Sequence, residues 1–145
     1  MGILAIDPGT TQSAFVIWDA SQREIIDKGI LLNNIMLSGI HQFPYHALVI
    51  EMVQSFGMPV GKEVFETCVW VGRFWQASHY PVHLLYRKDV KSFLCGSMKA
   101  KDSNIRAALI DMLGKEVTKG VSKDVWSALA LAVTFTDTCH DEEKK

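Results

Sequence analysis

Short apolar runs bounded by turn residues dominate the first third of the chain. Residues 3–9 read ILAIDPG, an apolar run followed by an aspartate, a proline and a glycine. This pattern is typical of a strand that is buried on both faces and ends near Asp7, because proline cannot donate a hydrogen bond to a sheet. Residues 13–18 predict the returning strand of a hairpin, and residues 24–32 predict a third strand with Gly29 as a weak point or bulge.

Strands and helices alternate in the rest of the chain. Residues 33–43 show no clear pattern, whereas residues 46–52 predict a buried strand with Glu51 near its carboxyl end. Residues 53–61 contain two glycines and a proline and predict a loop. The remaining elements are expected in chain order: a helix over 62–78, a strand over 81–86, a helix from 87 that ends at Gly96, a helix from about 103 to 113, and an almost entirely apolar last helix that starts near Ser122 as its N-cap.

The order of these elements predicts an α/β domain with a mixed five-stranded sheet flanked by helices. A strand meander followed by β-α units forms such a sheet. By analogy, this is also the order of elements in the ribonuclease H-like fold. We expect one domain over residues 1–139 and a charged tail over residues 140–145, HDEEKK.

The composition limits the classes of function. The chain has 145 residues with 15 basic and 16 acidic side chains, so any contact with nucleic acid must depend on a local basic surface. Three cysteines at wide spacing indicate reduced thiols, and they form neither a disulfide framework nor a zinc pattern. We expect no signal peptide and no membrane-spanning segment, and therefore a cytoplasmic protein.

Three carboxylates occupy positions where open α/β sheets bind ligands. Asp7 and Glu51 end two apolar strands, and Asp124 lies in the first turn of the last predicted helix. If the two strands are parallel neighbours, their carboxyl ends meet at one crevice. Structural interpretations remain open, because Asp7 can start a turn and Asp124 can stabilise a helix N-terminus. Glu51 is the hardest of the three to explain in this way, since an unpaired acid in a buried strand is rare.

A cluster of carboxylates without basic partners needs a cation to neutralise it. Mg²⁺ prefers oxygen ligands of this kind, and Mn²⁺ can substitute for it. Two such ions about 4 Å apart can activate a water and stabilise the leaving oxygen in phosphodiester cleavage. The three acids therefore predict a metal site for phosphodiester chemistry.

Four segments in order resemble the RuvC-type Holliday junction resolvases, above all their compact phage-borne members. The segments are ILAIDPGTT, LVIEMV, KDVKSFLCGSMKAKDSNI and KDVWSALALAV, and together they cover most of the chain. The resemblance implies a dimeric, Mg²⁺-dependent endonuclease that nicks branched DNA, in the bacterial host cytoplasm if a phage encodes it. It matches Asp7, Glu51 and Asp124 to the family's first three carboxylates.

Ser127 stands where the resemblance implies a fourth carboxylate. Serine is neutral and a weaker metal ligand, so water or another acid such as Asp102 would have to complete the site. Alternatively, the chain binds junctions without cutting them efficiently. Both interpretations follow from the same departure.

Several basic residues are candidates for DNA contacts. Phosphate neutralisation supplies affinity without reading sequence, which suits an enzyme that recognises the shape of a branch. The resemblance puts Lys101 near the scissile phosphate. The full set of basic candidates is Lys99, Lys101 and Lys123 near the site and Arg87, Lys88 and Lys91 along one surface. A solvated role is the ordinary alternative for any one lysine.

Phe56 in the loop after Glu51 is a candidate for stacking on unpaired bases, and Met58 is the second candidate. Burial of Phe56 in the core is the open alternative. Helix 62–78 carries more large apolar side chains than one core stripe needs, so Trp70, Phe74 or Trp75 can pack against a second subunit, with Gly72 allowing close approach. A thick core helix explains the same residues.

Two other functions share these features. A non-catalytic junction-binding protein would keep the fold and lose the metal chemistry. The residues IDPGTT also resemble the phosphate-binding hairpin of actin-like ATPases and sugar kinases, but those proteins need two such domains and this chain has room for one. The substrate could also be a flap or a fork.

Overall fold

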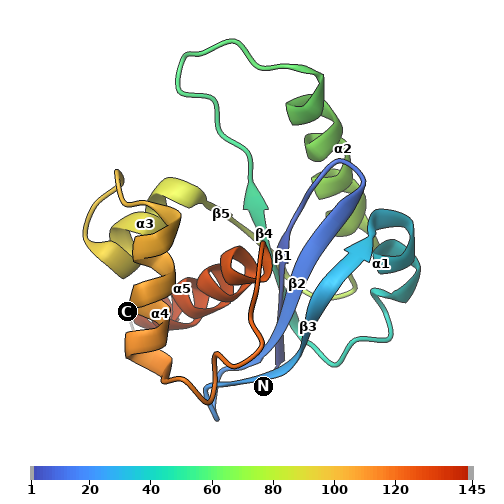
Figure 1. Cartoon of the computed structure of the whole chain (residues 1–145). Helices are drawn as coiled ribbons and strands as arrows, with labels where there is room; N and C mark the ends of the chain where they lie inside the picture. Colours follow the sequence, from blue (N-terminus) through green and yellow to red (C-terminus); the bar gives the residue numbers. More distant parts are fainter. Residues whose placement is uncertain (1, 144–145) are drawn as a thin grey trace.

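The structure is a computed structural model that describes residues 2–143, and the side-chain surroundings of residues 2–139. Its elements follow the predicted order (Figure 1). They are β1 (Gly2–Asp7), β2 (Gln12–Asp19), β3 (Glu24–Leu32), α1 (Asn33–Gly39), β4 (Ala47–Met52), α2 (Lys62–Ala77), β5 (Val82–Tyr86), α3 (Arg87–Cys95), α4 (Asp102–Leu113) and α5 (Val125–Glu143). No helix in the described part of the chain is long and apolar enough to cross a membrane.

The strands form one mixed sheet in the order β3-β2-β1-β4-β5. β1, β2 and β3 are an antiparallel meander, whereas β4 and β5 run parallel to β1. Ile6 lies opposite Ile50 in the parallel ladder, so the next residues, Asp7 and Glu51, lie side by side at the carboxyl edge. The predicted α/β class and mixed sheet are therefore confirmed.

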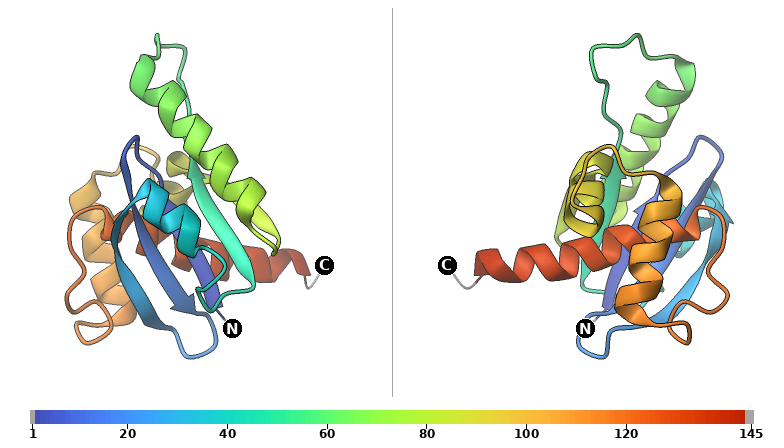
Figure 2. Two further views of the ribbon diagram at one scale, coloured as in Figure 1. Left: turned by 90° about the vertical axis from the view of Figure 1, so that its right-hand side faces the viewer. Right: turned by 60° about the vertical axis from the view of Figure 1, so that its left-hand side comes forward.

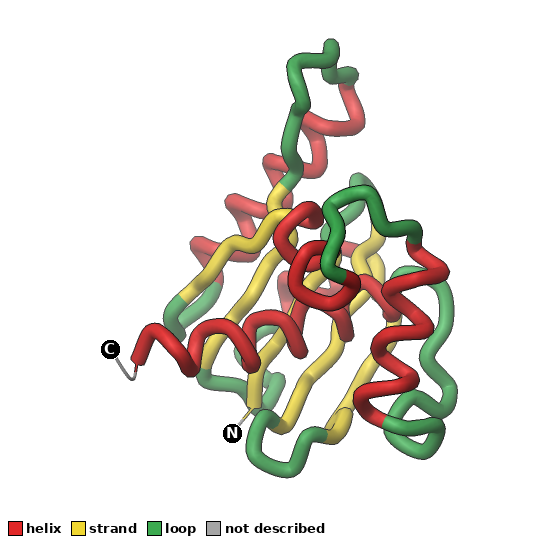
Figure 3. Tube along the Cα trace, turned by 90° about the vertical axis from the view of Figure 1, so that its left-hand side faces the viewer, coloured by secondary structure: helices red, strands yellow, loops and turns green. Residues whose placement is uncertain are grey.

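Helices cover both faces of the sheet (Figures 2 and 3). α3, α4 and α5 lie on one face, and α1 and α2 lie on the other. Alternate residues of β1 enter the two cores: Ala5 packs with the apolar residues of α5, whereas Leu4 and Ile6 pack with Phe74 of α2. The continuous apolar run in β1 is thus explained by burial on both sides.

The bulge in the meander does not occur at Gly29. The register between β2 and β3 shifts between Ile17 and Trp18, which leaves Ile26 as the extra residue. Gly29 instead pairs with Phe15, and a Cβ at Gly29 would lie 3.3 Å from that ring. The missing Cβ lets the ring lie close to the strand, and the strand continues through the glycine.

The last helix begins two residues later than an N-cap at Ser122 predicts. α5 starts at Val125, and residues 122–124 form a turn in which the Val125 N–H donates to the Ser122 carbonyl at 3.1 Å. Lys123 has a positive φ of 50°, which a helix cannot include. Ser122 is therefore not the N-cap, and Asp124 directly precedes the helix. α5 continues to Glu143, so the expected tail starts within a helix; side chains of residues 140–145 lie outside the described residues.

One of the two apolar sides of α2 packs on the sheet. Thr67, Val71 and Phe74 are buried, so Phe74 belongs to the core and is unavailable to a second subunit. Phe65 and Val69 are exposed. Because α2 is apolar on two sides, its own periodicity could not indicate which side packs on the sheet.

Candidate active site

Asp7 and Glu51 form the centre of the candidate site. Asp7 is the last residue of β1 and Glu51 is the penultimate residue of β4, its neighbour in the sheet. Their carboxyl groups are close enough to share a hydrogen bond. Two half-buried acids in contact need a proton or a cation between them.

The pKa of Asp7 is strongly raised in this pair. Burial raises the pKa of Asp7 to about 8, with further increases from the negative charge of Glu51, the hydrogen bond to Glu51 and the charge of Asp124. The positive charge of Arg87 opposes this rise in the pKa. Without a bound cation, Asp7 therefore carries a proton at neutral pH, and a cation between the acids would displace it.

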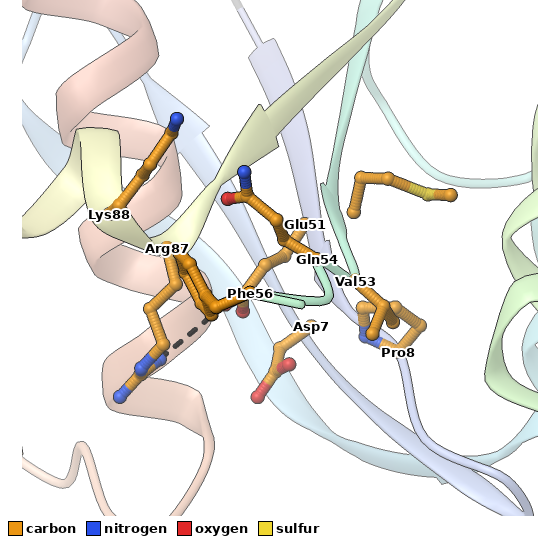
Figure 4. A pocket seen from close by; sticks show the side chains of 9 residues that line it. Asp7, Pro8, Glu51, Val53, Gln54, Phe56, Arg87 and Lys88 are labelled. Atoms are coloured by element: carbon orange, nitrogen blue, oxygen red, sulfur yellow. Dashed lines mark ion pairs between the residues drawn. The ribbon is translucent and has the colours of Figure 1, made fainter. Parts of the chain in front are cut away.

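Arg87 lies inside the acidic cluster (Figure 4). Its Nη1 atom is 3.6 Å from a carboxylate oxygen of Glu51 and donates to the Ser127 hydroxyl at 3.3 Å. Its Nη2 atom pairs with the carboxylate of Asp102. The cluster thus contains a basic partner that the sequence analysis expected on an outer DNA track.

Two clefts meet at Arg87. One cleft, of about 260 Å³, is lined by Asp7, Glu51, Lys88 and the loop with Gln54 and Phe56. The other, of about 200 Å³, is lined by residues of α4, of the turn before α5 and of the first turn of α5, including Asp102, Arg106, Lys123, Asp124 and Ser127. Arg87 lines both clefts, so its guanidinium lies between the Asp7 side and the Asp124 side of the candidate site.

The donors of this cluster fit a hard divalent cation. Asp7, Glu51 and Asp124 offer only oxygen atoms, as Mg²⁺ requires, and the charges of Glu51 and Asp124 add to burial in raising the pKa of Asp7. Among the side chains that the structure describes, however, no three Asp, Glu, His or Cys groups lie together as a ready-made metal site. The exposed Asp124 acts on Asp7 through its charge, and its side chain would have to turn inward to join the pair.

Comparison with solved structures decides the fold. The structure of Thermus thermophilus RuvC superposes with a TM-score of 0.79 and 18% sequence identity, over 98% of this chain and 97% of that chain. T. thermophilus RuvC in complex with Holliday junction substrate gives a TM-score of 0.78 at 19% identity, over 98% and 96% of the two chains.

The chain has the RuvC-type fold. The agreement covers nearly the full length of both proteins, so it includes β1, β4 and α5, the elements that hold the three acids. At this identity the likeness establishes architecture alone. No protein-family model and no curated protein sequence matches the chain.

On this RuvC-type fold the predicted DNA-contact residues lie in different places. Lys88 lines the cleft with Asp7, and Lys123 lines the cleft with Asp124. Lys91, Lys99 and Lys101 line neither cleft; Lys99 and Lys101 are exposed in and beside the loop between α3 and α4. Lys101 precedes α4, and its N–H donates to the Asn104 side chain at 2.9 Å, so the backbone there is fixed while the side chain is exposed.

The loop of residues 53–61 projects beyond the body of the domain together with the first turns of α2 (Figure 2). Phe56 is 70% exposed and Met58 is 73% exposed. Burial of Phe56 in the core is therefore excluded, and the ring is available beside the cleft that it lines.

Two cleft residues were missed by the sequence analysis. Arg106 of α4 lies over the Trp126 ring at 5.5 Å and lines the cleft with Asp124. Gln54 follows Glu51 by three residues, and its buried side-chain oxygen has no hydrogen-bond partner. The proximity of Gln54 to Glu51 in the sequence could have indicated Gln54 as a site residue. No sequence signal could have indicated Arg106, because the packing of α4 on α5 brings it to Trp126.

Proposed function

We propose that this chain is a metal-dependent, structure-selective DNA endonuclease that resolves four-way junctions. The observation that carries the proposal is the contact between Asp7 and Glu51 at the carboxyl edge of the sheet, with Asp124 near enough to raise the Asp7 pKa. Support also comes from the fold that the chain shares with RuvC of T. thermophilus, which has been solved with a Holliday junction.

Asp7 and Glu51 would hold a divalent cation such as Mg²⁺, or Mn²⁺ as substitute, with Asp124 as the third ligand. When bound, the cation polarises a water and neutralises charge on the phosphate. Asp7 would hold the cation in its deprotonated form together with Glu51, and both residues line the same cleft as Phe56. Lys88, Lys101 and Lys123 contact flanking phosphates, while Phe56 stacks on bases that are unpaired at the branch.

We also infer that two copies of the chain associate through the outer face of α2. Phe65 and Val69 are 61% and 60% exposed, and the neighbouring Gly72 and Trp75 extend the same apolar stripe. Such a stripe on a charged domain favours a partner, and a second copy would present two nuclease sites to the symmetric arms of a junction.

A non-catalytic junction-binding role is the second candidate. Its specific support is the ion pair between Arg87 and Glu51, together with serine at position 127. In that case the arginine would neutralise the acids permanently, and no metal would be needed for junction binding.

Nicking of a labelled four-way junction in Mg²⁺ or Mn²⁺ tests these alternatives. We expect paired nicks in opposite strands that are lost in Asp7→Asn and in Glu51→Gln, whereas Asp111→Asn, an exposed residue of α4, is the matched control and keeps the activity. Tight junction binding without nicks in either metal would support the non-catalytic role. If the chain neither binds nor nicks the junction, both roles are refuted.

A further inference from the structure

We propose that Arg87 contacts the scissile phosphate and takes the place of a second metal ion, so that the chain cleaves DNA with one divalent ion per site. This inference rests on the proposed nuclease function. It concerns a residue that the sequence analysis treated only as part of an outer basic track.

Arg87 is bound to the residues that would otherwise be free to hold a second ion. Ser127 and Asp102 are the residues that could complete a site lacking its fourth carboxylate, and both are bound to the guanidinium. The Ser127 hydroxyl accepts from Nη1 at 3.3 Å, and the Asp102 carboxylate accepts from Nη2. An additional cation at these ligands would have to displace a fixed positive charge or stand beside it.

Arg87 leaves the Asp7–Glu51 pair available to the first ion. Its Nη1 atom is 3.6 Å from Glu51, beyond an ordinary hydrogen bond, whereas its contact with Asp102 is closer. The guanidinium is therefore anchored on the Asp102 and Ser127 side. Glu51 keeps its hydrogen bond to Asp7, and this pair remains available to a cation.

The backbone holds Arg87 in this position. β5 lies beside β4 with Tyr86 opposite Met52, so Arg87 follows at the same edge of the sheet as Glu51 and begins α3. Its side chain is 36% exposed, which leaves part of its donor set facing the two clefts. A planar guanidinium has five donors, more than its present partners use, and it matches the geometry of a phosphate.

A positive group on the phosphate besides the metal would stabilise the charge that develops during cleavage. During hydrolysis the oxygen of water bonds to phosphorus, the bond from phosphorus to the 3′ oxygen breaks, and the products are a 5′-phosphate and a 3′-hydroxyl. The attacking water gives a proton to solvent, and the departing oxygen takes one from solvent. Arg87 N–H groups would stabilise the charge on the non-bridging oxygens in the transition state.

The test compares metal binding with cleavage in Arg87→Gln, Arg87→Lys and the unchanged chain. Arg23→Gln is the matched control, because Arg23 also binds a carboxylate with two nitrogens, at Asp137 on another part of the surface. Mn²⁺ binding is followed by electron paramagnetic resonance, single-turnover nicking is measured on a four-way junction, and circular dichroism reports folding.

We expect one Mn²⁺ per chain and a Hill coefficient of about one for the metal dependence of nicking. Arg87→Gln should bind Mn²⁺ at least as tightly as the unchanged chain, yet nick on the order of 100-fold more slowly. Arg87→Lys should recover part of the rate that Arg87→Gln loses, because lysine keeps the positive charge.

Three results would overturn the inference. They are two Mn²⁺ ions bound per unchanged chain, an undiminished nicking rate in Arg87→Gln, and a loss of Mn²⁺ binding in a folded Arg87→Gln, which would make Arg87 a structural support for the acids. If the unchanged chain neither nicks junctions nor binds Mn²⁺, the proposed nuclease function itself fails, and this outcome is distinct from the other three.

Discussion

Asp7 and Glu51 share a hydrogen bond at the carboxyl ends of two parallel strands. Both acids follow fully apolar segments of the core, so neither can withdraw into solvent without breaking the sheet. The fold therefore holds negative charge where two carboxylates repel each other. The pair is therefore stabilised by binding a proton or a metal ion.

Asp7→Asn should stabilise the protein at alkaline pH. The Asp7 pKa is about 8 in the folded chain and 3.8 as its ordinary value, so the stability linked to this group is fully present below pH 3.8 and is lost as the pH rises through 8. The asparagine variant lacks this loss. We expect its melting temperature to exceed that of the unchanged chain by about 5 °C at pH 9, and the two to converge near pH 4.

Thermal melts by circular dichroism in a chelating buffer measure this effect. Mg²⁺ should stabilise the unchanged chain and leave Asp7→Asn unaffected, because a ligand stabilises only the state that binds it. Equal melting temperatures at pH 9 would show that the acids do not repel each other as the structure indicates.

Phe56→Leu should weaken binding to a four-way junction about tenfold, because an aromatic ring stacked on a base contributes about 1–3 kcal/mol. Leucine keeps the apolar surface and removes the stacking. Binding to linear duplex of the same length should change little. Fluorescence anisotropy measures both affinities, and Met112→Leu, at an exposed position near the end of α4, is the control. An equal loss on linear duplex would indicate a general contact.

Val69→Glu should convert a dimer into a monomer without unfolding it. Val69 is exposed on α2, so we expect the free energy of unfolding of the monomer to change by less than about 0.5 kcal/mol. Phe74→Ala on the buried side of the same helix should instead lower that free energy by about 3–5 kcal/mol. Light scattering coupled to gel filtration gives the mass, and urea unfolding gives the stability. A monomeric unchanged chain would refute the interface.

Lys123→Gly should raise the stability of the protein and weaken its binding to junctions. Lys123 has a φ of 50° and its side chain lines the cleft with Asp124. Glycine adopts this conformation without strain, so the free energy of unfolding should rise by about 1 kcal/mol. Junction binding should weaken, and the slope of log K against log salt concentration should fall by about 1, the value for one lost phosphate contact. Weaker binding with an unchanged salt dependence would show that Lys123 does not contact DNA.

The sequence by itself determined the sheet and the two acids at its edge. Continuous apolar runs bounded by turn residues identify β1 and β4 as buried strands, and a strand buried on both faces places the residue after its apolar run at the end of the ladder. Asp7 and Glu51 could therefore be expected at one edge once the order of elements suggested parallel neighbours.

Only the tertiary structure decided which face of α2 is buried, where α5 begins and what neutralises the acids. α2 is apolar on two sides, and the choice between them depends on the surface of the sheet, which is built from distant segments. Ser127 lies 40 residues from Arg87 along the chain. The guanidinium reaches it because β5 pairs with β4 while α5 crosses the same face, and no local pattern records that convergence.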